Sequence, residues 1–187
     1  SPAGSLVSIA AERAVKSGIV VVASAGNEGQ SLWRLDAPAA SPAVLAVGAQ
    51  QLGVVTSPGD EWTTGFSSVS SARPPDIIAP GQSVRSVRVP GSFIDEVFPR
   101  GRVGEYSFLG SGTSQAAAAT TGVVALLLQA QPTLTPDGVK CRLMAAARPA
   151  VDAVGRRLIG KGHLGVWRSR VRDLPEFAGE LPVATLA

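Results

Sequence analysis

The chain of 187 residues has little of the residues that most often carry chemistry: one cysteine, one histidine and one asparagine. A lone cysteine excludes a disulfide within the chain, and we expect Cys141, inside a predicted helix, to be a small buried hydrophobic residue. The sequence has no His/Cys cluster and no EF-hand spacing. No segment approaches the roughly 20 apolar residues that cross a bilayer, so we predict no membrane span.

Charge is also scarce, at 17% of residues, whereas 45% are hydrophobic, which indicates a globular chain with a substantial core. The net charge is +3, and nine of the 17 basic residues lie in one stretch: Lys140, Arg142, Arg148, Arg156, Arg157, Lys161, Arg168, Arg170 and Arg172. Only Trp167 adds an aromatic residue there, and no nucleic-acid-binding motif accompanies it. We therefore predict a solvated basic face and no nucleic-acid partner.

The most informative segment is Gly112-Thr113-Ser114, which runs directly into a strongly apolar helical pattern. From Ala116 to Leu128 almost nothing is polar, so we expect a helix that is buried on all sides. Ser114 then lies on the first turn, where unpaired N–H groups and the helix dipole favour negative charge. That environment suits a serine nucleophile; the alternative is that Thr113 or Ser114 only caps the helix.

A second segment combines a strand with a small-residue turn. The β-branched run Ile19–Ala23 is typical of a strand buried on both faces. It leads into Ser24-Ala25-Gly26-Asn27, at the carboxyl end of the strand, where open α/β sheets place ligands. The amide of Asn27 could donate a hydrogen bond to a developing oxyanion, although a turn asparagine has the same pattern.

Together these segments resemble the second half of a subtilisin-like serine protease, a subtilase, from about Leu6 to Val166. Five segments carry the resemblance in family order: 22–27, 41–49, 66–68, 76–81 and 112–116. The resemblance implies a three-layer α/β fold with a mostly parallel central sheet whose N-terminal part is missing.

For the site, the resemblance implies Ser114 as the nucleophile of a serine endopeptidase and Asn27 as a side-chain oxyanion donor, with the Ser114 N–H as the second donor. Ser24, Ala25 and Gly26 would form one wall of a pocket for the polypeptide substrate. Secretion is also expected from the resemblance. Subtilases often bind calcium, partly through backbone carbonyls, so the resemblance allows a calcium cofactor, although no specific site is predicted.

Two departures from the family pattern stand out. Ala118 stands where many subtilases have proline, and we interpret this as a variant, since proline is tolerated but not required near a helix start. More seriously, subtilases place the catalytic Asp and His before the asparagine, and neither residue occurs before Asn27. The helix predicted over 6–14 also lacks a preceding strand. We therefore expect a fragment: residues 1–166 as the C-terminal half of a catalytic domain, whose partner is the missing N-terminal half, and 167–187 as an extension or tail.

The remaining segments are less specific. Val84–Val89 alternates and predicts a half-exposed strand, and Pro90–Gly104 predicts a loop or hairpin insertion with solvated charges. The acidic pairs Asp60/Glu61 and Asp95/Glu96 are interpreted as solvated. Thr135-Pro136-Asp137 predicts a capped helix start. The glycine-rich segment 160–166 resembles the family's closing segment, which makes His163 structural.

Two alternatives belong to other classes. The first is a non-catalytic subtilase-like binding or scaffold protein, in which the missing groups are absent from the gene. The second is a hydrolase that uses Ser114, Asp152 and His163, the triad order of α/β-hydrolases. Their Gly-x-Ser-x-Gly motif is only half matched, because Ala116 stands in the place of the second glycine.

Overall fold

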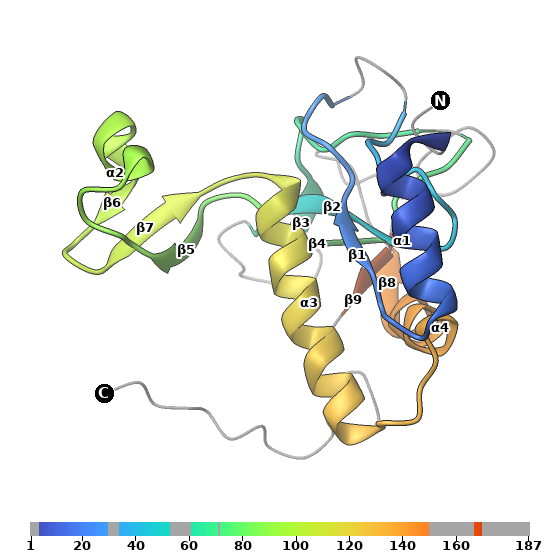
Figure 1. Cartoon of the computed structure of the whole chain (residues 1–187). Helices are drawn as coiled ribbons and strands as arrows, with labels where there is room; N and C mark the ends of the chain where they lie inside the picture. Colours follow the sequence, from blue (N-terminus) through green and yellow to red (C-terminus); the bar gives the residue numbers. More distant parts are fainter. Residues whose placement is uncertain (1–3, 30–33, 53–60, 71, 150–166, 170–187) are drawn as a thin grey trace.

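The computed structural model describes residues 4–29, 34–52, 61–70, 72–149 and 167–169, and its main body has three layers (Figure 1). The central sheet has the order β1-β2-β4-β9-β8, with β3 paired to β2. Strands β1, β2, β4 and β9 are parallel, whereas β3 and β8 run antiparallel to their neighbours. The strands are β1 Val22–Ser24, β2 Leu45–Leu52, β3 Glu61–Thr63, β4 Ile77–Pro80, β8 Ala147–Pro149 and β9 Trp167–Ser169. The predicted α/β fold with a mostly parallel central sheet is confirmed.

Helices pack on both faces of this sheet, and side chains along β2 alternate between two cores. Ala46 of β2, with Val44 just before the strand, packs in a cluster with Ala11 of α1 (Leu6–Lys16). Leu45 and Val47 pack in a second cluster with α3 (Thr113–Ala130) and α4 (Pro136–Ala146). The sheet is therefore apolar on both faces, as expected for parallel strands between helices.

Helix α3 is less enclosed than its sequence predicted. It turns Ala116, Thr120, Val124 and Leu127 toward the sheet, at helical spacing. The expectation of burial on all sides is wrong, since the opposite face is exposed: Ala118, Ala119, Ala125 and Leu126, the last by 38%. The reason is that nothing in the described part of the chain covers that face.

Strand β1 also differs from its prediction in detail. It begins at Val22, three residues later than expected, and it lies at the edge of the sheet. Its neighbourhood is not buried on both faces, because Ile19 is 57% exposed and Val22 is only half-buried. Among the described strands β1 has a hydrogen-bonded neighbour on one side only, and the other side of such an edge strand can pair with another chain segment.

Helix α4 begins as predicted. The Thr135 side chain accepts a hydrogen bond from the Gly138 N–H at 3.1 Å, and Pro136 occupies the first turn. Val139 and Leu143 are buried against the sheet. The prediction for Cys141 is wrong, because it is exposed: at about 100° per residue it lies on the face opposite to those two side chains.

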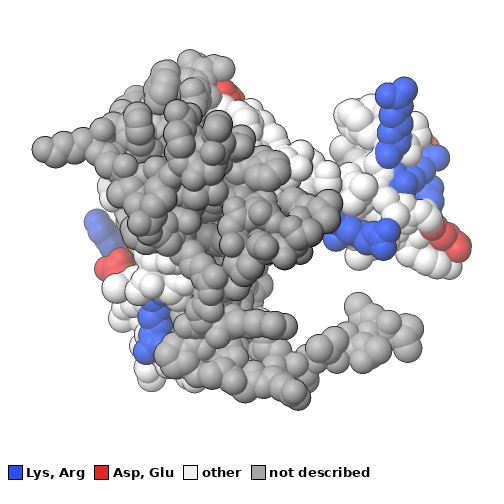
Figure 2. All heavy atoms as spheres, turned by 180° about the vertical axis from the view of Figure 1, so that it is seen from behind, with Lys and Arg blue, Asp and Glu red and all other residues white. Residues whose placement is uncertain are grey.

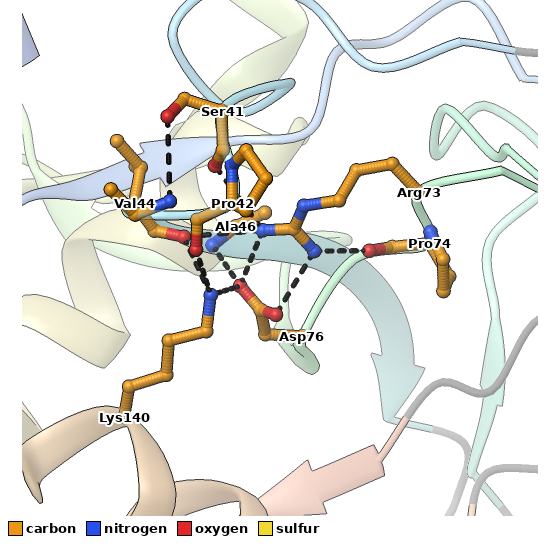
Figure 3. A network of polar contacts seen from close by, with 9 residues as sticks. Ser41, Pro42, Val44, Ala46, Arg73, Pro74, Asp76 and Lys140 are labelled. Carbon is orange, nitrogen blue, oxygen red and sulfur yellow. Dashed lines mark hydrogen bonds and ion pairs between the residues drawn. The ribbon is translucent and has the colours of Figure 1, made fainter. Parts of the chain in front are cut away.

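A buried carboxylate ties α4 to the sheet (Figure 3). Asp76, just before β4, accepts hydrogen bonds from the Ala46 N–H at 2.8 Å and from both terminal nitrogens of Arg73 at 2.9 Å. Lys140 of α4 lies 3.0 Å from the same carboxylate and donates to the Pro42 carbonyl at 2.7 Å. Burial lowers the pKa of Lys140, and Asp76 opposes that shift. Removing one partner of such a buried ion pair costs about 3–5 kcal/mol. The network therefore holds the N-terminal ends of β2 and β4 against α4.

Residues 84–110 form an arm that projects away from the main body (Figure 1). It contains a three-stranded antiparallel sheet of order β5-β7-β6 and a short helix. The elements are β5 Val84–Val87, α2 Phe93–Val97, the 3-10 helix η2 Pro99–Gly101, β6 Arg102–Val103 and β7 Ser107–Gly110. The strand predicted from Val84 is confirmed but ends at Val87, and the expected alternation is wrong, because Arg85, Ser86 and Val87 are all exposed. The predicted insertion proves to be folded.

Asp95 holds the arm together. Its side chain is 4% exposed and accepts hydrogen bonds from Arg88 Nε at 2.6 Å, Arg102 Nε at 2.8 Å and the Gly91 N–H at 3.1 Å. These donors, Arg88 first, hold the pKa of the carboxyl well below its usual range. The expectation that Asp95 is solvated is wrong. Its two arginine partners lie seven residues before and seven residues after it in the sequence, and the fold of the hairpin brings both to its carboxylate. Other basic side chains of the arm lie at the surface (Figure 2).

Several predictions fall outside the described residues. These are the segment 160–166 with His163, the carboxylate of Asp152 and the pair at Asp60. The boundary between 1–166 and a tail also stays a prediction; Trp167–Ser169 pairs with β4 and β8 in the central sheet. Within the described ranges, no helix combines the length and hydropathy that crossing a bilayer requires.

Candidate functional site

Two segments 86 residues apart meet where β1 ends and α3 begins, and Thr113 joins them. The Thr113 N–H donates to Asn27 Oδ1 at 2.8 Å. The fully buried Thr113 hydroxyl accepts from the Gly26 N–H at 3.2 Å and lies at donor distance, 3.1 Å, from Asn27 Oδ1. These hydrogen bonds therefore fix the start of α3 against the turn after β1.

This contact also orients the amide of Asn27. Because Oδ1 is occupied by Thr113, the nitrogen end of the amide is the end left for another acceptor. Nδ2 lies 3.6 Å from where a Cβ on Gly112 would stand, beside the approach to Ser114. Asn27 itself is exposed, so its donor faces solvent or a bound molecule.

Ser114 is the second residue of α3 and is exposed. The first intrahelical hydrogen bond closes from the Ala116 N–H to the Gly112 carbonyl at 3.4 Å. The N–H groups before it have no helical partner. Asn27 takes the one on Thr113, and no described residue accepts from the one on Ser114. Ser114 thus directly follows Thr113, the residue whose N–H is bonded to Asn27 Oδ1.

The alternative that Thr113 or Ser114 merely caps α3 does not describe the observed geometry. Gly112 occupies the cap position and provides no side chain. The acceptor that a capping side chain would supply comes instead from Asn27, in another segment. Gly112 is in turn fixed by its N–H, which donates to the Gly81 carbonyl at 2.7 Å at the end of β4.

The predicted pocket wall lies directly beside these groups. Ser24 ends β1 and is half-buried, while Ala25 and Gly26 are buried. Gly26 has φ +112°, a conformation that favours glycine. A Cβ there would also lie only 2.6 Å from Glu28 Oε2 and from Asp36 Oδ2.

Two carboxylates therefore lie behind this wall. A hydrogen bond from the Ser68 hydroxyl, at 2.7 Å, lowers the pKa of Glu28. Burial and the neighbouring charge of Glu28 raise the pKa of Asp36. The two shifts have opposite directions because Ser68 stabilises one anion, whereas the other is partly withdrawn from water.

Among the described residues, no group of three or more His, Cys, Asp or Glu side chains could hold a metal ion. The two buried carboxylates, Asp76 and Asp95, are already paired with lysine or arginine. We assign no chemical step to a metal.

Sequence reasoning placed Ser114 and Asn27 but missed the positioning role of Thr113 and the contact between Gly81 and Gly112. The signal was weak: Thr113 was visible only as a candidate cap, and a hydroxyl that bonds a distant turn has the same sequence pattern. Gln115 was also missed; its side chain lies within 2.7 Å of where a Cβ on Gly110 or Gly112 would stand.

The chain is similar in sequence and in fold to known subtilisin-like proteases. The serine protease AprX of Bacillus subtilis (strain 168) is 42% identical over 135 residues, which is 70% of this chain and 30% of the relative. Subtilisin DY of Bacillus licheniformis is 34% identical over 159 residues, or 84% of this chain and 48% of the relative. Fervidolysin from Fervidobacterium pennivorans, a keratinolytic enzyme related to subtilisin, has a TM-score of 0.66 at 29% identity, covering 94% of this chain and 25% of that one.

The chain thus spans less than half the length of each of these relatives. The model of the subtilase family matches residues 1–162, which include both segments of the candidate site and every strand of the central sheet described above except β9. By this match and by its identity to the curated relatives, the chain belongs to the subtilase family.

Proposed function

We propose that this chain supplies the nucleophile and the oxyanion donors of a serine endopeptidase. The observation that supports the proposal is the hydrogen bond from the Thr113 N–H to Asn27 Oδ1, because Thr113 precedes Ser114 and the bond leaves the Asn27 amide nitrogen to donate elsewhere. Membership of the subtilase family and similarity to proteases support the same class of reaction.

In the proposed reaction, Ser114 Oγ attacks the carbonyl carbon of a peptide bond and its proton passes to a histidine. The carbonyl oxygen becomes an oxyanion, which accepts hydrogen bonds from Asn27 Nδ2 and the Ser114 N–H. The C–N bond then breaks as the histidine returns its proton to the leaving amine. Water, activated by the same histidine, hydrolyses the acyl-enzyme and regenerates the Ser114 hydroxyl.

We propose that this histidine, and the aspartate that orients it, come from a segment outside these 187 residues. The sequence has neither residue before Asn27, where subtilases place them. The exposed apolar face of α3 and the edge position of β1 support the proposal. Further segments of the fold would pack on that face of α3 and pair with the edge of β1. The same surfaces should make the isolated chain poorly soluble.

Ser24, Ala25 and Gly26 are proposed as one wall of the pocket for a substrate side chain, because they adjoin Asn27 and Gly26 is bonded to Thr113. The opposite wall would belong to the segment outside the chain. A secreted location is proposed from the family alone.

The proposal is tested by peptide hydrolysis with two samples: the 187-residue chain alone, and the same chain supplied with the upstream segment of its gene, joined or separate. We expect hydrolysis only in the second sample, because only it has a general base. The control is an equal amount of the upstream segment alone. A complete reading frame without an upstream Asp and His, together with no hydrolysis in either sample, would favour the non-catalytic scaffold instead.

A further inference from the structure

An open pocket of about 730 Å³ lies where the arm joins the start of α3. Its apolar walls are Ile94 and Val97 of α2, the following Phe98, and Phe108 and Leu109 of β7. This volume falls in the range of about 300–1,000 Å³ that is usual for ligand pockets. No motif in the sequence predicted it, because its walls form only when the insertion folds back on β7.

The apolar walls are not covered within the described structure. Ile94 is 51% exposed, Val97 48% and Phe98 56%. Monomeric proteins rarely expose contiguous apolar surface of this kind unless it binds something. The pocket is also preformed, because Asp95 of α2 is held by Arg88 and Arg102 on either side of the arm.

The pocket adjoins the candidate active site. Gln115, the residue after Ser114, lines it together with Gly110 and Ser111. The Gln115 amide covers the backbone of Gly110, since a Cβ there would lie 2.7 Å from its nitrogen. In Figure 1 the arm leaves the start of α3 on the side opposite to β1, which bears the proposed wall Ser24–Gly26.

We propose that this pocket binds an apolar side chain of the polypeptide substrate, on the leaving-group side of the scissile bond. The inference rests on the proposed protease function. A peptide whose acyl side lies along Ser24–Gly26 and whose carbonyl lies at Ser114 continues toward Gln115 and the arm. The arm is thus a specificity element: its aliphatic and aromatic walls select substrates with a large apolar residue there, because burial of apolar surface stabilises the complex.

The test uses the chain together with its upstream segment and two matched double variants. Ile94→Ser/Val97→Ser makes the pocket wall polar, whereas Val87→Ser/Val89→Ser changes two residues of the same arm that do not line the pocket and are 79% and 63% exposed. Substrates share one acyl side and carry either Phe or Ser on the leaving-group side. We expect the unchanged protein to prefer the Phe substrates by about 10-fold in kcat/KM.

The pocket variant should lose this preference without slower cleavage of the Ser substrates, and the control variant should keep it. Equal preference in all three proteins, or an equal loss in both variants, overturns the inference while leaving the protease function in place. A second readout does not require catalysis: fluorescence polarisation of labelled leaving-group peptides with Phe or Ser. If no substrate is cleaved but Phe peptides bind more tightly than Ser peptides, and the pocket variant loses this difference, the pocket is supported and the protease function is contradicted. Equal affinity for Phe and Ser peptides contradicts the pocket.

Discussion

Alanine in place of Ser114 is expected to lower turnover of the assembled enzyme by about 10⁶-fold, the size of loss known for the nucleophile of subtilisin, a member of the same family. The reason is that the covalent route disappears, and only the oxyanion donors and substrate binding remain to assist water. The Ser114 side chain is exposed and makes no hydrogen bond with a described residue, so the variant should fold normally. The measurement is kcat for a peptide substrate, with thermal stability as the check on folding.

Ser17→Ala is the matched control, because Ser17 is also exposed and lies at the end of α1, bonded to the Arg13 carbonyl at 3.0 Å. Its turnover should equal that of the unchanged protein. Retention of more than a few per cent of activity in the Ser114→Ala variant would show that another group is the nucleophile.

The second large effect is expected at Asn27. Asn27→Ala should lower kcat by about 10²–10³-fold with little change in KM, the range known for the equivalent kind of donor in subtilisin. An oxyanion exists only in the transition state and the tetrahedral intermediate, so a donor aimed at it contributes to kcat rather than to substrate binding.

Asn27→Asp separates this role from the structural one. Aspartate retains an oxygen that accepts from the Thr113 N–H, as Asn27 Oδ1 does at 2.8 Å, but it has no N–H to donate. The Asp variant should therefore keep the thermal stability of the parent and lose at least as much turnover as the Ala variant. Turnover near the parent value in Asn27→Asp would remove Asn27 from the mechanism.

Part of the main-body fold was predictable from local signals: Thr135 with Pro136 marks the start of α4 without help from the rest of the chain. The three-layer fold and the strand after Ser41 were predicted from the resemblance to subtilases, and that strand alternates between two cores as β2. The candidate site was also visible, since Ser114 and Asn27 stand at the ends of strongly patterned elements.

What could not be predicted depends on contacts between distant segments. The burial of α3 was overestimated because an all-apolar sequence predicts a helix with packing partners on every face. The described chain provides such partners on one face only. Asp95 was misinterpreted because a charge looks solvated in sequence until the fold brings two arginines to it. Thr113 was underestimated because its partner lies in another segment.

The central claim is that Ser114 becomes a nucleophile only when a base arrives from outside this chain. The most direct measurement is covalent labelling by a serine-directed phosphonate, mapped to single residues by mass spectrometry. We predict labelling of Ser114 in the chain supplied with its upstream segment, and none in the 187-residue chain alone or in the assembled Ser114→Ala variant. Robust labelling of Ser114 in the chain alone, abolished by His163→Ala, would contradict the account and favour a triad contained within the chain.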